Sequence, residues 1–163
     1  MKHLKNLRYL DLRECDAQAS MPVGLGQLSY LRNLSKFVVG KDNGCGIDEL
    51  KELALDGELS IVGLGNMMDL LLPNLVEISL EYCQRCDQLP RLGKLRFLKV
   101  LTIRRMDVLK HIGSSFYGDM GSSFPLLEVF KIRGAPCLEE WTTVNGGEHF
   151  PLLSSLTIYS SPS

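Results

Sequence analysis

Apolar residues along the chain recur first at every third position and then at every second position. The clearest example begins with leucines at positions 92, 95, 98 and 101 and continues with Ile103 and Met106. Three-residue steps favour a helical turn or an irregular loop, and a two-residue step is typical of a β-strand with alternating faces. Such a segment predicts one loop followed by one short strand with an inward aliphatic pair.

The same order of spacings recurs in five segments of the chain. Their apolar positions are Leu4, Leu7, Leu10, Leu12 and Cys15; Leu72, Leu75, Ile78, Leu80 and Cys83; Leu92, Leu95, Leu98, Leu101, Ile103 and Met106; Phe124, Leu127, Phe130, Ile132 and Ala135; and Phe150, Leu153, Leu156 and Ile158. Intervals of 23, 29 and 26 residues separate the last four strand starts, at Ile78, Leu101, Phe130 and Leu156. This consensus at a period of about 20–29 residues is that of a leucine-rich repeat.

The segment from 16 to 72 carries a weaker form of the pattern, with strand-like runs at 37–39 and 59–61 that bring the total to about seven repeats. We therefore predict an α/β fold, a leucine-rich repeat solenoid with a parallel concave β-sheet and an irregular, partly helical convex side. Residues 1–163 are expected to form a single domain, with clear repeats at 1–15 and 73–160. Neither end supplies the polar cap that a stack of repeats requires, so the end repeats should be exposed.

The charge balance limits the kinds of partner that the chain is expected to bind. Lys and Arg total 18 against 19 for Asp and Glu, a net charge of −1, so no specific nucleic acid is expected as a partner. The longest apolar cluster, at 67–72, is far shorter than the roughly 20 residues of a membrane-spanning helix, and the N-terminus lacks a signal-peptide pattern. The five cysteines suit a reducing compartment, and a cytoplasmic protein, or a nucleocytoplasmic one, is predicted.

Two groups of residues invite a chemical interpretation. Cys83-x-x-Cys86 has the spacing of a zinc or redox pair, but no second Cys pair or spaced His pair completes four ligands. Cys83 and Cys15 hold the same repeat position, where a cysteine acts as a small buried apolar group. The three histidines lie far apart in the sequence. No catalytic residue, metal ligand or cofactor site is predicted, and a deep polar cavity holding His111 or Cys83 would contradict this view.

Strand alternation predicts which side chains face solvent on the concave sheet. Arg and Tyr, two residue types enriched at binding hot spots, gather there in the later repeats. The candidate partner-binding residues are Arg13, Glu81, Tyr82, Arg104, Arg105, Lys131, Arg133 and Tyr159. Each residue taken singly is equally well explained as a solvated polar position, whereas the patch as a whole favours recognition. Trp141 is either an exposed binding anchor or a side chain packed on the next repeat.

An ordered succession of short strings gives the chain a family resemblance over nearly its whole length. The strings include Pro73-Asn74-Leu75-Val76, Cys83-Gln84-Arg85-Cys86, Leu89-Pro90-Arg91-Leu92-Gly93, Phe116-Tyr117-Gly118, Phe124-Pro125 and Glu140-Trp141. The chain resembles the leucine-rich repeat region of plant intracellular nucleotide-binding disease-resistance proteins of the coiled-coil class. The resemblance implies a protein partner, namely a pathogen effector, a guarded host protein or the nucleotide-binding domain of a receptor.

The resemblance has two departures that affect function. The nucleotide-binding domain and coiled coil of the family are absent from this sequence, so nucleotide binding and signalling do not carry over. The short join at 62–72 has the form of an internal deletion of further repeats. The predicted function is therefore recognition of a protein by a truncated receptor or receptor fragment. The alternative is a non-signalling regulator or gene remnant with a scaffold role, and no constellation of residues supports an enzyme.

Overall fold

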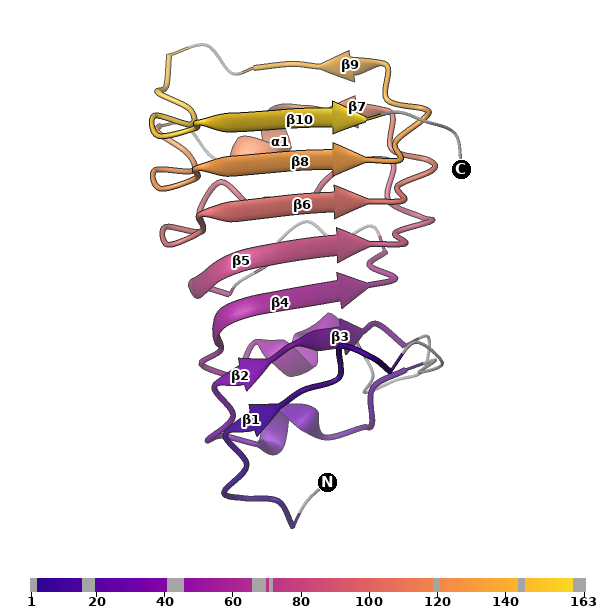
Figure 1. Cartoon of the computed structure of the whole chain (residues 1–163), viewed down its shortest axis with the longest axis vertical. Helices are drawn as coiled ribbons and strands as arrows, with labels where there is room; N and C mark the ends of the chain where they lie inside the picture. The colour runs from indigo at the N-terminus through magenta and orange to yellow at the C-terminus, as the bar shows by residue number, and fades with distance from the viewer. Residues whose placement is uncertain are drawn as a thin grey trace.

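The computed structural model describes residues 3–15, 20–40, 46–65, 70, 72–118, 121–143 and 146–159. Parallel strands stacked along the long axis dominate these residues (Figure 1). The largest sheet has six strands in the order β10-β8-β6-β5-β4-β3. Their bounds are β3 Lys36–Val38, β4 Asp56–Val62, β5 Asn74–Glu81, β6 Val100–Arg104, β8 Val129–Arg133 and β10 Ser155–Tyr159. A parallel pair, β1 (Tyr9–Leu10) and β2 (Asn33–Leu34), lies toward the N-terminus.

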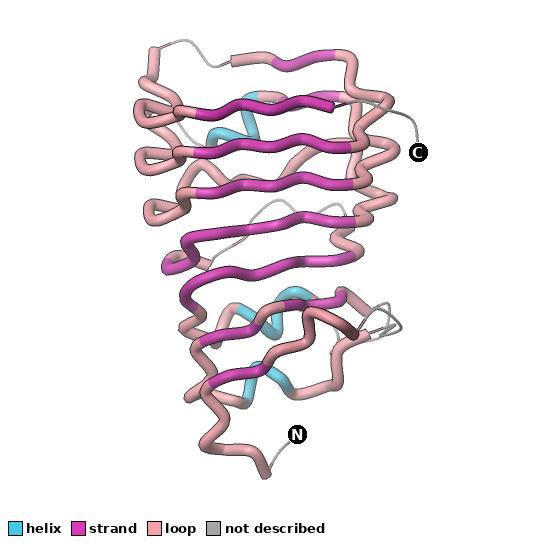
Figure 2. The backbone as a smooth tube through the Cα atoms, viewed as in Figure 1, coloured by secondary structure: helices cyan, strands magenta, loops and turns pink. Residues whose placement is uncertain are grey.

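The chain returns between strands through loops, single turns of helix and one small sheet. The helical turns are η1 (Leu25–Gln27), η2 (Ile47–Leu50) and α1 (Ser114–Tyr117), and the small sheet pairs β7 (His111–Ile112) with β9 (Glu140–Trp141) (Figure 2). A three-residue apolar spacing suits a 3-10 turn, which has three residues per turn and rarely extends beyond one turn. The helices are therefore short, and the fold is α/β with a mostly parallel sheet.

The core lies directly behind the large sheet, and the predicted alternation of its strands is confirmed. Ile78, Leu101 and Phe130 face one another in register across β5, β6 and β8, and each is 0% exposed. The second aliphatic position of each strand is equally buried. The side chains that alternate with them lie on the opposite side of the sheet, which we call the sheet face.

The first strand is shorter than the sequence pattern predicts. β1 ends at Leu10, because the amide of Leu12 donates to the Ser35 hydroxyl at 2.7 Å and not to a backbone carbonyl of the next strand. Cys15, expected to be buried like Cys83, is exposed, which corrects that expectation. Cys83 is enclosed between neighbouring layers, whereas Cys15 belongs to the first layer and no described residues cover its other side.

The join between β4 and β5 leaves the sheet continuous. Within the segment 62–72, residues 66–69 and 71 lie outside the described residues. β4 and β5 pair in parallel along their length, with a shift of register at Gly57/Glu58. β4 and β5 are therefore direct neighbours in the sheet.

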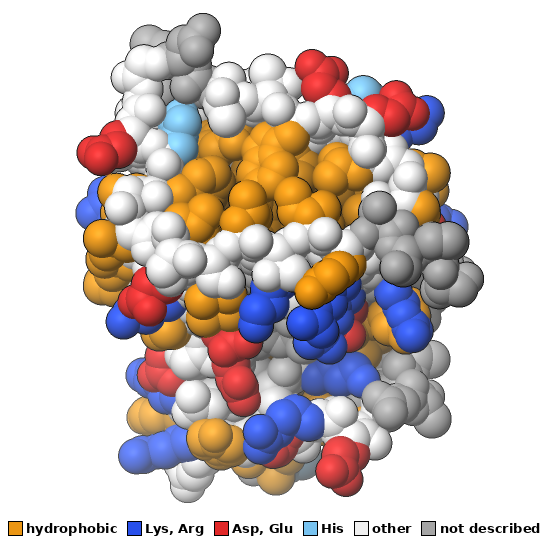
Figure 3. Space-filling model, turned by 45° about the horizontal axis from the view of Figure 1, so that its top comes forward, with side chains coloured by type: hydrophobic (Ala, Val, Ile, Leu, Met, Phe, Trp, Pro, Cys, Tyr) orange, Lys and Arg blue, Asp and Glu red, His pale blue; other side chains and the backbone are white. Residues whose placement is uncertain are grey.

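The C-terminal end of the stack presents apolar side chains to solvent. Leu156 and Ile158 in β10 occupy the same positions as the buried pairs of β6 and β8, yet they are 50% and 48% exposed. β8 lies against one side of β10, and no described strand pairs with its other edge. Figure 3 shows hydrophobic side chains gathered at this end of the molecule.

Among the described residues, the structure contains no helix with the length and apolar character needed to cross a membrane.

Candidate functional site

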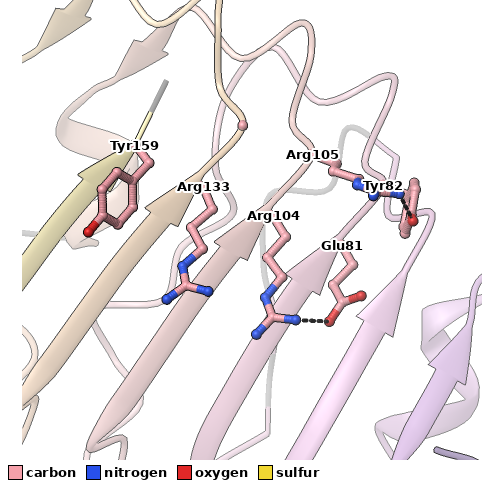
Figure 4. A pocket seen from close by; sticks show the side chains of 7 residues that line it. Glu81, Tyr82, Arg104, Arg105, Arg133 and Tyr159 are labelled. Carbon is pink, nitrogen blue, oxygen red and sulfur yellow. Dashed lines mark hydrogen bonds and ion pairs between the residues drawn. The ribbon is translucent and has the colours of Figure 1, made fainter. Parts of the chain in front are cut away.

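One register position near the carboxyl ends of the strands collects the polar side chains of the sheet face. Glu81, Arg104, Arg133 and Tyr159 pair with one another in sequence across β5, β6, β8 and β10. Parallel strands lie about 4.8 Å apart, so each side chain is adjacent to the next. Figure 4 shows these four side chains projecting from the sheet in a row. The row is a direct product of the repeat, because each member stands one residue after the second aliphatic of the alternating pair in its strand.

A depression of about 560 Å³ lies over this row. Its lining consists of Glu81, Tyr82, Arg104, Arg105, Arg133, Gly134 and Tyr159. Six of the eight residues singled out in the sequence are thus brought together. A volume of this size falls within the range of ligand pockets.

The other two predicted residues lie elsewhere. Lys131 is on β8, two residues before Arg133, beside Thr102 and Thr157 in the neighbouring row. Arg13 lines a separate depression of about 440 Å³ with Asp11, Leu12, Glu14 and Cys15. Arg13 contacts Asp11 at 2.5 Å, and the hydrogen bond from this guanidinium holds the pKa of the Asp11 carboxyl well below its usual range.

The turn that follows each strand brings two more large side chains to the depression. Tyr82 and Arg105 follow β5 and β6 directly and have φ values of +54° and +53°, in the left-handed region. Glycine occupies the equivalent position after β4 and β8, as Gly63 and Gly134, with φ values of +76° and +71°. All four amides donate to the carbonyl of the last residue of the next strand, at 2.9–3.1 Å. The fold therefore requires left-handed backbone here, and two layers meet that requirement without glycine.

Left-handed backbone at a residue other than glycine costs of order 1–3 kcal/mol and persists where the surroundings determine it. Here the two residues contact each other: the Arg105 guanidinium donates a hydrogen bond to the Tyr82 hydroxyl and lies 4.8 Å from the centre of its ring (Figure 4). The pair defines one end of the depression. The contact between the two side chains could not be derived from spacing alone, because it depends on the turn geometry after each strand.

The charge of the lining is positive. It contains three arginines and one glutamate. Glu81 approaches Arg104 at 4.0 Å and also accepts a hydrogen bond from Ser79 at 2.9 Å. The Arg133 guanidinium lies 6.0 Å from the centre of the Tyr159 ring, and no described carboxylate forms an ion pair with it.

Gly134 is the one lining residue that sequence reasoning missed. The signal was present, because a glycine directly after a strand matches Gly63 in the earlier layer. Strand alternation does not single it out, because Gly134 lies in the turn after β8 and carries no side chain.

The candidate metal and redox positions are enclosed in the core. Cys83 and Cys86 are 0% and 1% exposed, and the Cys86 thiol donates to the carbonyls of Leu64 and Gly65 at 3.0 and 2.9 Å. The contact with Cys86 and burial raise the pKa of the Cys83 thiol, which keeps it protonated. Among the described residues, no three His, Cys, Asp or Glu side chains are grouped as they would be to hold a metal ion. Neither Cys83 nor His111 lines the depression.

Trp141 packs on its own layer and on the preceding one, whereas the sequence left open an exposed anchor or packing on the next repeat. Its ring is half-buried and meets Phe130 edge-on at 5.5 Å between centroids. Its indole N–H donates to the Tyr117 hydroxyl at 2.6 Å. Trp141 therefore joins the return segments to the core and takes no part in the depression.

Comparison with known proteins bears directly on the layers that carry the site. Residues 65–106, which include β5, β6 and the Tyr82–Arg105 pair, match the family model of the leucine-rich repeats of R13L1/DRL21. Two Arabidopsis thaliana proteins are similar over about half of the chain: disease resistance protein At3g14460 is 31% identical over 55% of the chain, and disease resistance RPP13-like protein 1 is 36% identical over 54%. No solved structure matches the chain.

The chain spans only 7% and 9% of the length of these two relatives, so the similarity concerns a small part of each and not the whole proteins. The family model and both relatives agree in kind with the resemblance inferred from the sequence strings. Their names state leucine-rich repeats for the family model and disease resistance for the two relatives. The resemblance of this chain to the leucine-rich repeat region of plant disease-resistance proteins is therefore confirmed.

Proposed function

We propose that this chain is a non-catalytic protein-recognition module of a plant disease-resistance receptor or receptor fragment, which binds a protein partner in the cytoplasm through the sheet face. In this proposal the chain forms one leucine-rich repeat solenoid of about seven repeats and the sheet face is its concave side. The partner is a pathogen effector, a guarded host protein or a domain of a receptor.

The observation that carries the proposal is the depression over the Glu81, Arg104, Arg133 and Tyr159 row. A surface that only had to remain solvated would not need Tyr82 and Arg105 at a turn where glycine costs less. Tyrosine and arginine supply large contact areas and directed hydrogen bonds, and both are enriched at binding hot spots. Recognition explains the residue types and their strained backbone together.

The test is partner capture from plant cells with a charge-reversed sheet face. The tagged chain, its Arg104→Glu/Arg133→Glu variant and a control are expressed in leaves, and captured proteins are quantified by mass spectrometry. The control, Arg96→Glu/Lys110→Glu, makes the same change of charge at two exposed residues outside the depression. Circular dichroism of the purified proteins checks that all three are folded.

A partner set that is retained by the control and lost by the sheet-face variant supports the proposal. We expect a loss of roughly tenfold or more, because leaving a partner group opposite a like charge costs well over 1.4 kcal/mol. Partners captured equally by all three proteins would reject the sheet face as the binding surface. A folded chain with no specific partner would favour the alternative of a gene remnant or scaffold without recognition.

A further inference from the structure

We infer that the depression binds an anionic side chain, a carboxylate or a phosphate, that the protein partner inserts between Arg104 and Arg133. This inference rests on the proposed function and specifies the chemistry of the partner. The register of the two arginines, the walls around them and the acidic residues beside them support it.

The guanidinium groups of Arg104 and Arg133 lie side by side, and fewer negative charges than positive ones lie next to them. Arg104 and Arg133 are directly paired across β6 and β8, so about 4.8 Å of sheet spacing separates their backbones. Figure 4 shows both side chains directed away from the sheet in the same sense. Adjacent like charges repel, and Glu81 offsets only one of them, from the far side of Arg104 at 4.0 Å.

An anion placed between the two side chains would relieve that repulsion and gain hydrogen bonds from both. The planar guanidinium presents paired N–H donors whose spacing matches the oxygens of a carboxylate or phosphate. Such charge-assisted bonds are about twice as strong as neutral ones. The geometry thus favours an oxyanion over a neutral polar group.

The walls of the depression suit the aliphatic carbons that precede the charged group of an acidic side chain. Tyr159 lies against Arg133 at one end, and the Tyr82–Arg105 pair lies at the other. Both tyrosines are exposed, at 43% and 59%, so their rings are available to aliphatic carbons of a partner. Arg105 adds a third positive charge at the rim, held in place by the Tyr82 hydroxyl.

The neighbouring strands favour a single anionic group over a polyanion. Glu77 and Glu58 pair in register on β5 and β4, and Glu81 follows on β5. A nucleic acid strand extending from the arginines toward β4 would meet these carboxylates, and the whole chain carries a net charge of −1. A polypeptide with one acidic residue over the arginines and a basic or neutral residue over the glutamates fits both halves of the sheet face.

The experiment uses the purified chain and three short peptides that are identical except for a central phosphoserine, glutamate or glutamine. Binding is followed by NMR through the side-chain Nε–H signals of the arginines, which report weak binding at the site itself. We expect the phosphoserine or the glutamate peptide to shift the Arg104 and Arg133 signals and to bind roughly tenfold more tightly than the glutamine peptide. The Arg96 signal should not move.

Two variants and one competitor complete the test. Arg104→Gln/Arg133→Gln should weaken binding of the anionic peptide roughly tenfold or more, and the matched Arg96→Gln/Lys110→Gln variant should leave it unchanged. Inorganic phosphate that displaces the peptide at equal concentration would show that the site takes the free ion, and would overturn the assignment to a partner side chain. Binding of the glutamine peptide as tight as that of the anionic peptides would overturn the inference altogether.

The outcome separates this inference from the proposed function. If no anionic probe binds but captured partners are still lost with Arg104→Glu/Arg133→Glu, the sheet face recognises a protein by other chemistry and the anion inference fails alone. If, in addition, the double variant captures the same partners as the unaltered chain, both proposals fail.

Discussion

The position of a leucine along the stack predicts how much it contributes to stability. Leu101 in β6 is 0% exposed and lies in register between Ile78 and Phe130. Leu156 holds the same position in β10, but it is 50% exposed, and only β8 lies against its strand. Replacing each by alanine therefore removes the same atoms from two different environments.

The magnitudes follow from burial. A fully buried leucine loses its transfer free energy on truncation and leaves a cavity, and the measured range for such changes is about 2–5 kcal/mol. Layers on both sides of Leu101 restrict collapse of the cavity, so we expect Leu101→Ala to lower the free energy of unfolding by about 3 kcal/mol. Half of the Leu156 side chain is already in water and no closed cavity forms, so we expect about 1 kcal/mol for Leu156→Ala.

The assay is urea-induced unfolding of the wild-type chain and both variants, followed by far-ultraviolet circular dichroism. Midpoints are compared at a common slope, and an unchanged slope shows that the same surface unfolds in each protein. Amide hydrogen exchange of β6 and β10 provides a local check, since the end layer should exchange faster. Equal losses at Leu101 and Leu156, or a larger loss at Leu156, would refute the argument that the middle layers enclose Leu101 and the end layer leaves Leu156 open.

Three further substitutions test other contacts. Gly93→Ala should lower the free energy of unfolding by about 1–3 kcal/mol in thermal unfolding, because the new Cβ would collide with the Tyr117 carbonyl. The control Gly113→Ala should lower it far less, because nothing lies within 4 Å of a Cβ at that position. Equal losses for the two variants would contradict the close approach at Gly93. Gly134→Ala should cost about 1 kcal/mol by urea unfolding because φ is +71°, and no loss would mean that the turn relaxes. Trp141→Phe should lower the free energy of unfolding by about 1 kcal/mol, because it removes the hydrogen bond to the Tyr117 hydroxyl. Removing that hydroxyl in the same protein should then add little, and a second loss of the same size would refute the pairing.

The strands were predictable where two apolar residues alternate. The pairs at 78 and 80, 101 and 103, 130 and 132, and 156 and 158 all lie in strands of the structure. The two-residue strands β2, β7 and β9 were not predicted, because so short a segment shows no periodicity. Their pairing depends on neighbouring layers, as when the Thr142 amide donates to the Ile112 carbonyl at 2.9 Å.

The candidate site was predictable in composition and less so in extent. Strand alternation alone predicts that Arg104 and Arg133 face the same side of the sheet, and the structure places both in one depression. The same reasoning included Lys131 and Arg13, which lie outside that depression. The repeat spacing gives both the face and the row of a residue, but the extent of the depression depends on which layers lie side by side and on the turns that follow the strands.

The sequence by itself determined the layered architecture and which side chains enter the core, because a period that changes from three to two residues is compatible with few folds. Only the tertiary structure decided which layers meet. Stacking brought Tyr82 to Arg105 and Trp141 to Tyr117 across 23 and 24 residues. It also left Leu156 half in water although its spacing is that of a buried residue. Burial depends on whether another layer lies alongside, and the spacing within one repeat carries no information about that.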